Sequence, residues 1–458
     1  MMSSTESDGL IFVEETKEQD RLLNNKTNTI VRNSSSRWFM LFMGSAIGLI
    51  NGIQNLQFAG FESTAVAFFE VSYVLGDLLT QAYYISFIAF GFPVIWLIMR
   101  YGLRFTVQCA ATLIFIGTAM TAISTSNRNF FFVALTSEFI AGCAQVFVLC
   151  LPSLLAGKWF PTNEISTASG TLVFFYQLGN GLSLLTAPLV VTKEFLGATL
   201  GMRAIVTFIS ISIFSFVMFI MIRLYFAEKP EFPPSEAQAT FSTPNTSFAK
   251  SLKNLFTDGD FVLLMFSYGI DFGIFSSVQS LFKSVIEDNF TGISDATTGQ
   301  IVSFMILVGT PAPLVFGIIL DKTKRFKWTL LCIHGICITS AIFLVFAMTS
   351  QTIWMVWVGI GIFGFGFTGK MSVGLETAAE MTYPEPEGTS SGILVWAMSL
   401  FTTIFIQVMR YLLTLSNVYV NVFIASCSVV AFIFTCFMQP DLRRTRANYE
   451  IIEDSDHK

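Results

Sequence analysis

Charged side chains are scarce in this chain. Only 12% of its 458 residues are charged, whereas an ordinary soluble domain has about 25%. Hydrophobic residues make up 53%, and phenylalanine alone occurs 50 times. This composition indicates a protein that crosses a membrane several times. The net charge of -5 says little about partners, because membrane topology depends on where lysine and arginine lie.

Metal-ligand and catalytic patterns are also lacking. None of the seven cysteines forms a CxxC or Cys/His spacing, and the two histidines, His334 and His457, stand alone. This argues against a zinc site or a disulfide framework. No Walker motif, G-x-S-x-G or H-E-x-x-H is present. We therefore expect no enzyme activity, no metal, no cofactor and no nucleic-acid partner.

The first 37 residues are polar and are predicted to form a disordered cytosolic tail. No apolar segment precedes Arg37, so a cleavable signal peptide is not expected. Within the tail, the stretch 18–23 (EQDRLL) resembles an acidic dileucine sorting signal. Both the plasma membrane and an endolysosomal membrane remain open as locations.

From Trp38 onward the chain is a series of apolar segments, each near the ~20 residues that a spanning helix needs. The hydropathy predicts about twelve transmembrane helices and an all-α membrane protein. We place these helices at 38–60, 78–99, 103–126, 130–157, 165–191, 203–226, 260–286, 297–320, 328–349, 352–381, 388–411 and 417–438.

The predicted helices divide into two sets of six. Residues 38–226 form one predicted bundle and 260–438 the other, joined by a proline-containing cytosolic linker at 227–259 and followed by a cytosolic tail at 439–458. Most basic residues fall in loops on one side, which predicts that both termini are cytosolic. Asn289 begins an N-x-T site that would then face outside, as a possible glycan acceptor.

This layout resembles the major facilitator superfamily. The stretch Gly317–Lys322 (GIILDK) is similar to that superfamily's loop signature between helices 8 and 9. The matching stretch after helix 2 keeps Arg100 and Arg104 but has Met99 where the acid belongs. The resemblance implies gating roles for Asp321, Arg100 and Arg104, with a first-half latch that is weaker or supplied by other groups.

A closer resemblance is to the feline leukaemia virus subgroup C receptor-related family. It rests on 144–153 (AQVFVLCLPS), on 267–270 (SYGI), and above all on 382–392 (TYPEPEGTSSG), and it extends from Trp38 to Arg444. The family implies movement of a small organic solute, with choline and ethanolamine as the established substrates and haem as the older proposal. A more distant lysosomal member is associated with a B6 vitamin.

The resemblance implies a choline pocket of aromatic and amide side chains, of which this sequence keeps Gln145 and Phe275. The tryptophan position of helix 1 is Asn55, and the asparagine position of helix 5 is Tyr176. The other altered positions of this pocket are Ser276, Ser399 and Lys370. A quaternary ammonium binds best over aromatic faces. Losing two aromatic positions and gaining a cation argues against choline as the main substrate.

The same residues suggest a polar cavity without any family. Asn51, Gln54 and Asn55 are spaced i, i+3 and i+4, so they share one face of a helix. Gln145 and Tyr176 fall at a similar depth, and secondary transporters bind substrate near the midplane between their halves. The alternative for a single amide is an interhelical hydrogen bond, worth about 0.6 kcal/mol.

Asp271 and Lys370 are charges that lie at similar depths inside predicted helices of the same half. Each costs about 2.5–3.5 kcal/mol on insertion scales, so a mutual pair or a wet cavity is expected. We hypothesise that Lys370 pairs with Asp271 in the empty carrier and meets an anionic or carbonyl group of the bound solute. The alternatives are a purely structural ion pair and a lysine that reaches the membrane surface.

These patterns favour a monomeric, facilitative carrier of a small organic solute that works by alternating access in the lipid bilayer. A proton-coupled carrier of an anionic or vitamin-like solute remains an alternative through Asp271. It is disfavoured because the only intramembrane histidine, His334, falls on a helix expected to be peripheral. A non-transporting receptor or scaffold is the other alternative. Haem stays open, since Cys143 or Tyr176 could approach the cavity.

Overall fold

The computed structural model describes residues 34–59, 62–190, 201–232, 247–290 and 295–447, and every regular element in them is a helix. The helices run in chain order as α2 (Arg37–Leu56), α3 (Glu62–Phe69), α4 (Tyr73–Ser124), η2 (Arg128–Phe130), α5 (Phe131–Trp159), α6 (Ile165–Val190), α7 (Met202–Tyr225), α9 (Phe248–Thr257), α10 (Gly259–Asn289), α11 (Asp295–Gly309), α12 (Ala312–Thr323), α13 (Phe326–Thr349), α14 (Ile353–Met381), α15 (Glu387–Leu415) and α16 (Asn417–Phe437).

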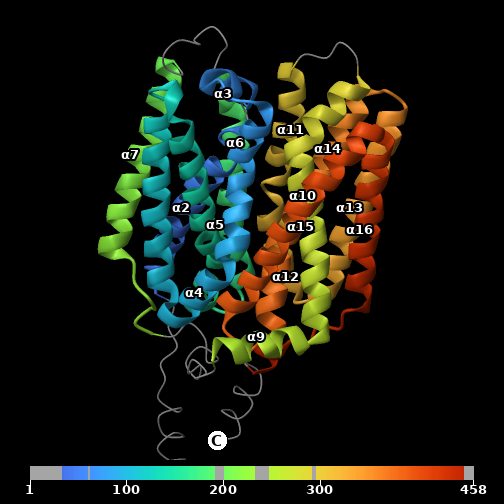
Figure 1. The fold of residues 1–458 in the computed structure, drawn as a ribbon. Helices are drawn as coiled ribbons and strands as arrows, with labels where there is room; N and C mark the ends of the chain where they lie inside the picture. The colour runs from blue at the N-terminus through green and yellow to red at the C-terminus, as the bar shows by residue number, and fades with distance from the viewer. Residues whose placement is uncertain (1–33, 60–61, 191–200, 233–246, 291–294, 448–458) are drawn as a thin grey trace, which may run out of the picture.

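Two helical bundles stand side by side (Figure 1). The bundle of α2 to α7 forms the N-terminal half, and the bundle of α10 to α16 forms the C-terminal half. The short helix α9 lies across one end of the molecule, within the stretch predicted as a linker. The predicted all-α fold in two halves is confirmed, and only the exact domain boundaries stay a prediction.

The described residues contain ten helical stretches that are long and apolar enough to span a membrane. One of them, within α4, is 44 residues long, which is too long for a single crossing. Gly102 interrupts α4 with φ 78° and ψ -166°, a backbone conformation that glycine adopts without a steric penalty. Gly102 therefore divides α4 into two legs, which correspond to the predicted helices 78–99 and 103–126.

The remaining predicted helices also have counterparts. The predicted helix 297–320 is divided into α11 and α12 around Thr310 and Pro311. The predicted helix 165–191 corresponds to α6. In lipid, helices associate through close packing of small residues, since there is no hydrophobic driving force between them. The sequence follows this rule where α6 crosses α12, because a Cβ on Gly317 would come within 2.6 Å of the Ser166 carbonyl oxygen.

Several predictions concern residues outside the described ranges. The dileucine-like stretch 18–23 and His457 are among them. The N-x-T site is described only as far as Phe290, so its threonine lies outside as well.

Candidate functional site

The hydroxyl of Tyr176 is the centre of a polar cluster in the N-terminal half. Gln145 Nε2, from α5, donates to this hydroxyl oxygen at 3.0 Å, and Asn55 Nδ2, from α2, donates to it at 3.2 Å. Asn55 Nδ2 also donates to Asn180 Oδ1 at 3.0 Å, and Asn180 Nδ2 donates to Gln177 Oε1 at 2.8 Å. Three helices thus converge on one tyrosine, and we call Asn55, Gln145, Tyr176 and Asn180 the Tyr176 cluster.

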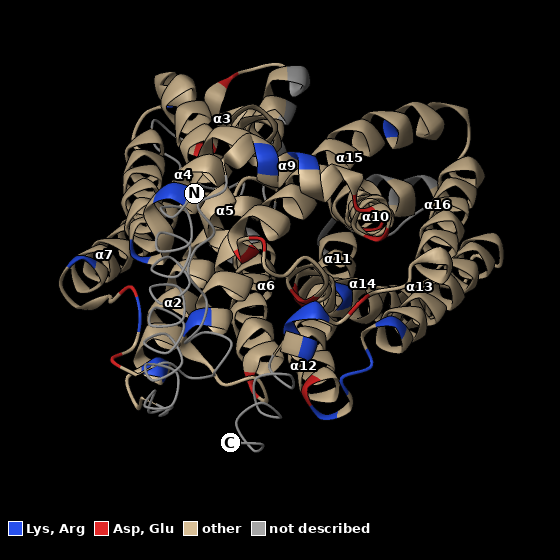
Figure 2. Ribbon diagram, turned by 90° about the horizontal axis from the view of Figure 1, so that it is seen from below, with Lys and Arg blue, Asp and Glu red and all other residues tan. Residues whose placement is uncertain are grey.

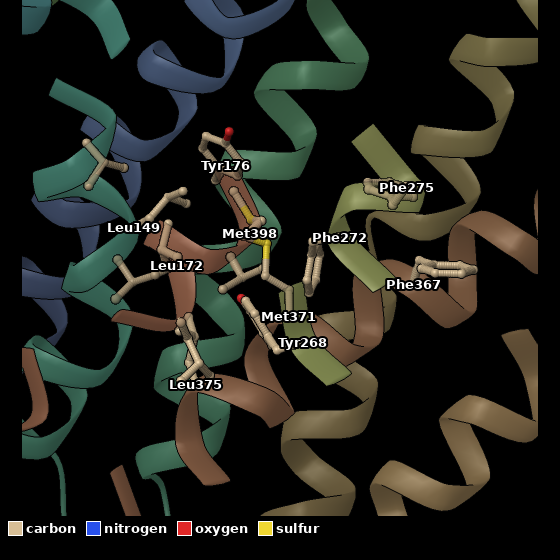
Figure 3. Packing of buried hydrophobic residues seen from close by; sticks show 14 of the residues in the cluster. Leu149, Leu172, Tyr176, Tyr268, Phe272, Phe275, Phe367, Met371, Leu375 and Met398 are labelled. Carbon is tan, nitrogen blue, oxygen red and sulfur yellow. The ribbon is translucent and has the colours of Figure 1, made fainter. Parts of the chain in front are cut away.

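The Tyr176 cluster faces the C-terminal half. Gln177, next to Tyr176 on α6, reaches Met371 Sδ of α14 at 3.9 Å. Tyr176 and Met371 also line one small cavity, whose other lining residues all belong to the N-terminal half. Figure 3 shows Tyr176 and Met398 close together, with Tyr268, Phe272 and Met371 opposite. A polar, amide-rich wall therefore meets an aromatic and thioether wall at the boundary of the two bundles.

Two amide oxygens in the cluster have no partner. Asn55 Oδ1 and Gln145 Oε1 are both buried without a hydrogen bond in the described structure. Their side chains are 6% and 1% exposed, and a buried acceptor without a donor costs about 1–3 kcal/mol. The hydroxyl of Tyr268, on the opposite wall, is likewise buried without a partner. The site therefore has capacity for a ligand that donates hydrogen bonds.

Other predicted site residues point elsewhere. Asn51 accepts from the Tyr83 hydroxyl at 3.1 Å and donates to Ala141 O at 3.2 Å, within the N-terminal half. Gln54 turns toward the second leg of α4 and donates to Ile114 O at 3.4 Å. The shared helix face was therefore a correct inference about spacing, but only Asn55 of this set joins the Tyr176 cluster.

Two predicted residues of the C-terminal half serve packing or local bonding. Phe275 stacks on Phe363 and Phe367 of α14, with ring centroids 6.4 and 6.1 Å apart. Figure 3 shows Phe275 and Phe367 on the far side of Phe272 from Tyr176. Ser399 is fully buried, and its hydroxyl donates to Val395 O one turn earlier at 3.2 Å. Their contact with a solute stays a prediction.

Lys370 lies in a second polar cluster, inside the C-terminal half. Its ammonium bonds to Asp271 Oδ2 of α10, to Ser267 Oγ at 2.9 Å, and to His334 Nε2 of α13 at 2.9 Å. Ser267 Oγ also lies 2.9 Å from Thr435 Oγ1 of α16. We call Lys370, Asp271, His334 and Ser267 the Lys370 cluster. The hypothesised pair of Lys370 and Asp271 is therefore present in this structure.

The Lys370 cluster is buried within the C-terminal half. Lys370 and His334 are 0% exposed and Asp271 is 1% exposed. Within the described residues, its hydrogen bonds and ion pairs join α10, α13, α14 and α16 alone. Contact between Lys370 and a solute stays an untested prediction, and this arrangement gives it no support.

His334 was misjudged from the sequence. The prediction treated it as a lone residue on a peripheral helix and used that position against proton coupling. The structure places its Nε2 beside the pair of Lys370 and Asp271, 2.9 Å from Lys370 Nζ and 3.1 Å from Asp271 Oδ2. The helix is peripheral, but this side chain points into the bundle, so the stated reason for preferring a facilitative carrier no longer holds.

The predicted latch residue Asp321 bridges the two halves. Its carboxylate accepts from the backbone N–H groups of Ser166 and Thr167, at 3.1 and 2.7 Å, and from the Thr167 hydroxyl at 2.7 Å. These donors are at the first turn of α6, where a carboxylate is stabilised by the helix dipole. We refer to this side of the molecule as the Asp321 end, which Figure 2 views from below.

The matching latch of the first half has a substitute acid. Glu228, just after α7, accepts from the backbone N–H groups of Leu103 and Arg104 at 3.0 and 2.5 Å, and it pairs with Lys158 of α5. The expectation that other groups replace the missing acid is therefore met by Glu228. Arg104 contributes its backbone there, while the Arg100 guanidinium lies 5.9 Å from the ring centroids of Trp96 and Tyr101. Side-chain gating roles for both arginines stay predictions.

Three carboxylates pair with one arginine at the Asp321 end. Arg444, which is 8% exposed at its side chain, pairs with Glu376 and Glu380 of α14 and Glu387 of α15 at 3.2, 3.1 and 3.0 Å. Burial lowers the pKa of the Arg444 guanidinium, but the three carboxylates outweigh it and hold that pKa above its usual value. The segment after α16 is thereby fixed beneath α14 and α15.

Some residues that the sequence analysis did not assign to a site could have been found from their spacing, and others could not. Asn180 is four residues after Tyr176, so helical spacing alone places it on the same face. Glu228 and His334 were unmarked, because each acts through a partner that is distant in sequence.

Comparison with known proteins places this geometry in a family. The sequence pattern of the Major Facilitator Superfamily matches residues 38–406. This chain belongs to the Major Facilitator Superfamily. Its fold is similar to that of the fucose:proton symporter FucP of E. coli, with a TM-score of 0.70 at 11% identity over 89% of this chain and all of FucP. It is also similar to the proton:xylose symporter XylE, with a TM-score of 0.69 at 15% identity over 91% of this chain and 99% of XylE.

Sequence relatives narrow the family further. The chain is 33% identical over 422 residues to the choline/ethanolamine transporter flvcr2a of Danio rerio, which covers 90% of this chain and 88% of the relative. It is 30% identical over 434 residues to the choline/ethanolamine transporter FLVCR2 of Homo sapiens, covering 93% and 81%. The choline/ethanolamine transporter FLVCR1 of Felis catus matches at 33% over 424 residues, covering 91% and 75%. The resemblance noted from the sequence motifs is confirmed.

The chain is therefore a multi-pass membrane protein of a transporter family and not of an enzyme family. The relatives are named for choline and ethanolamine, and the haem expectation gains no support from these names.

Proposed function

We propose that this protein carries a small polar organic amine across the membrane by alternating access, and that the Tyr176 cluster binds it. The observation that carries the proposal is the pair of unpartnered amide oxygens, Asn55 Oδ1 and Gln145 Oε1, beside one tyrosine hydroxyl. Substrate sites of secondary transporters lie between the two halves near the midplane, which agrees with the position of this cluster opposite Met371 and Met398.

The unpartnered acceptors favour an amine that has N–H groups. A primary ammonium such as that of ethanolamine can donate to both amide oxygens, whereas the trimethylammonium of choline has no hydrogen to donate. Choline instead depends on aromatic faces, and the helix 1 position that would supply one is Asn55. We therefore propose ethanolamine-like amines as preferred cargo, with choline a weaker substrate. Tyr268 and Phe272 supply the apolar wall for the carbon chain.

Uptake into proteoliposomes tests this proposal. Ethanolamine, its N-methyl and N,N-dimethyl derivatives, and choline form a series in which each added methyl group replaces one N–H. We expect KM to rise along the series, and Gln145→Leu to flatten that trend because it removes one acceptor. A KM that falls toward choline would overturn the preference. Solute binding without uptake would instead indicate a receptor.

The orientation of the carrier is a separate proposal. We propose that the Asp321 end and both termini face the cytosol, because basic residues concentrate in the loops of that end, as Figure 2 displays on both bundles. An epitope added before residue 1 should react with antibody only after cells are permeabilised. Reaction in intact cells would reverse the orientation. Imaging the same cells distinguishes the plasma membrane from an endolysosomal one.

A further inference from the structure

The ring of His334 has a defined hydrogen-bond pattern. Its Nδ1 lies 2.9 Å from the Leu330 carbonyl oxygen, and a carbonyl only accepts, so Nδ1 carries a hydrogen. Its Nε2 lies 2.9 Å from the Lys370 ammonium, which only donates. The neutral ring therefore directs its Nε2 lone pair into the Lys370 cluster, toward both Lys370 and Asp271.

The carboxylate of Asp271 has spare capacity. Oδ2 accepts from Lys370 and lies 3.1 Å from His334 Nε2, while Oδ1 is buried without a partner in the described structure. One carboxylate can accept from two donors, one at each oxygen. The cluster thus holds an Asp271 oxygen without a donor, beside a His334 lone pair that faces the Lys370 ammonium.

We propose that the Lys370 cluster is a proton-binding site that makes transport depend on pH. A proton adds to the Nε2 lone pair of His334, and the new N–H donates to Asp271 Oδ2. The Lys370 ammonium, which now faces a cationic ring, shifts to Asp271 Oδ1 and keeps its bonds to Ser267. No covalent bond other than N–H forms, and the cluster gains one positive charge.

The groups around Asp271 determine whether the charge of a proton added to His334 can be neutralised. The other titratable groups near the carboxylate are the thiols of Cys337 on α13 and Cys427 on α16, and neither can neutralise an added positive charge while it remains a thiol. Net charge in a sealed, apolar bundle is costly. Protonation therefore favours a conformation in which α10 and α14 separate and water enters, and acid shifts the carrier away from the arrangement seen here.

The cluster is coupled to the solute site through neighbouring residues in the chain. Ser267, Asp271 and Lys370 are each followed directly by a residue of the solute-facing wall: Tyr268, Phe272 and Met371. A change of partner at Asp271 therefore moves α10 and α14 at the positions that face Tyr176. This inference goes beyond the proposed function, because it concerns a proton and not the cargo.

Nuclear magnetic resonance of 15N-labelled histidine tests the site without any solute. The chain has two histidines, so His457→Gln leaves His334 as the only signal in the full-length protein. The titration runs from about pH 8 to about pH 5, and we expect a neutral Nδ1–H ring at the high end and an imidazolium ring at the low end. A ring that stays neutral across the range overturns the proposal.

Uptake measurements provide a second test of the proposed proton site. With ethanolamine as the probe, we expect uptake at saturation to change several-fold over the same pH range in wild-type protein and to become insensitive to pH in His334→Gln. Uptake that ignores pH while His334 titrates would overturn the link to transport. Absence of ethanolamine uptake at every pH would count against the proposed cargo, while a titrating His334 would still establish the proton site.

Discussion

The two polar clusters of this protein differ in charge, in position and in how many of their hydrogen-bonding groups have a partner. The Tyr176 cluster is uncharged, lies in the N-terminal half facing the other half, and leaves two acceptors open. The Lys370 cluster is charged, lies within one half, and binds its ammonium to a carboxylate, an imidazole and a hydroxyl. A ligand site needs unmet hydrogen-bonding capacity at an interface that opens. A buried charge needs partners before anything else.

The comparison shows why Lys370, a charge inside a predicted helix, was a poor indicator of where the solute binds. Lys370 was the most unusual residue of the sequence, because a charge in lipid is costly. Asp271 and His334 offset that cost by binding the Lys370 ammonium, so no solute is needed to stabilise the buried charge. The less conspicuous Asn55, which costs little in lipid, is the residue with an open acceptor at the interface.

The largest expected effect comes from breaking the charged pair. Lys370→Met removes the cation that pairs with the buried Asp271 carboxylate, and loss of one partner of a buried pair costs about 3–5 kcal/mol. We expect a large fall in the thermal unfolding temperature of the purified protein. Lys370→Met combined with Asp271→Asn removes both charges, so it should recover most of that stability.

The double variant is the control for this prediction. If Lys370→Met alone unfolds at the wild-type temperature, the pair contributes nothing and the contrast between the two clusters fails. If the double variant is less stable than either single variant, the cluster is held together by more than its charges.

A smaller and different effect is expected from Tyr176→Phe. The substitution removes the hydroxyl that accepts from Asn55 and Gln145 and leaves both donors without it, which costs about 1–3 kcal/mol. We expect KM for ethanolamine to rise by about tenfold, which corresponds to about 1.4 kcal/mol, with a modest change in unfolding temperature.

The matched control is Tyr411→Phe, the same change at a side chain that is 65% exposed on α15. It should leave both KM and stability at wild-type values. Equal effects at Tyr411 and Tyr176 would show that the response does not arise in the Tyr176 cluster.

The smallest effect is expected at Ser399. Its hydroxyl bonds only to the Val395 carbonyl in the described structure, and a helix retains that turn without it. Ser399→Ala should change stability by less than about 1 kcal/mol and leave ethanolamine uptake unaltered. A large loss of uptake would place Ser399 in the solute site, as the sequence first suggested.

The sequence alone predicted the helices well, because hydropathy and helix length are local properties. The motif around Asp321 lies within a few residues and agrees with the bonds of its carboxylate to α6, while the gating role of Asp321 stays a prediction. The sequence did not predict how Asn51, Gln54 and Asn55 divide among different neighbours. Rotation of a helix within its bundle depends on contacts with distant segments.

The same reason explains the missed partners. Glu228 replaces an acid that the motif after helix 2 lacks, but it binds there from more than a hundred residues away. His334 joins Lys370 from another helix, and no spacing in the sequence links the two. Tertiary contacts of this kind follow from the packing and are not visible in any short stretch.

The most direct test is a high-resolution structure of the full-length protein with ethanolamine bound. We predict density for the amine between Asn55, Gln145 and Tyr176, with its nitrogen within hydrogen-bonding distance of the two open amide oxygens, and an unoccupied Lys370 cluster. Density for the amine beside Lys370 and Asp271, with none at Tyr176, would contradict the assignment of the two clusters.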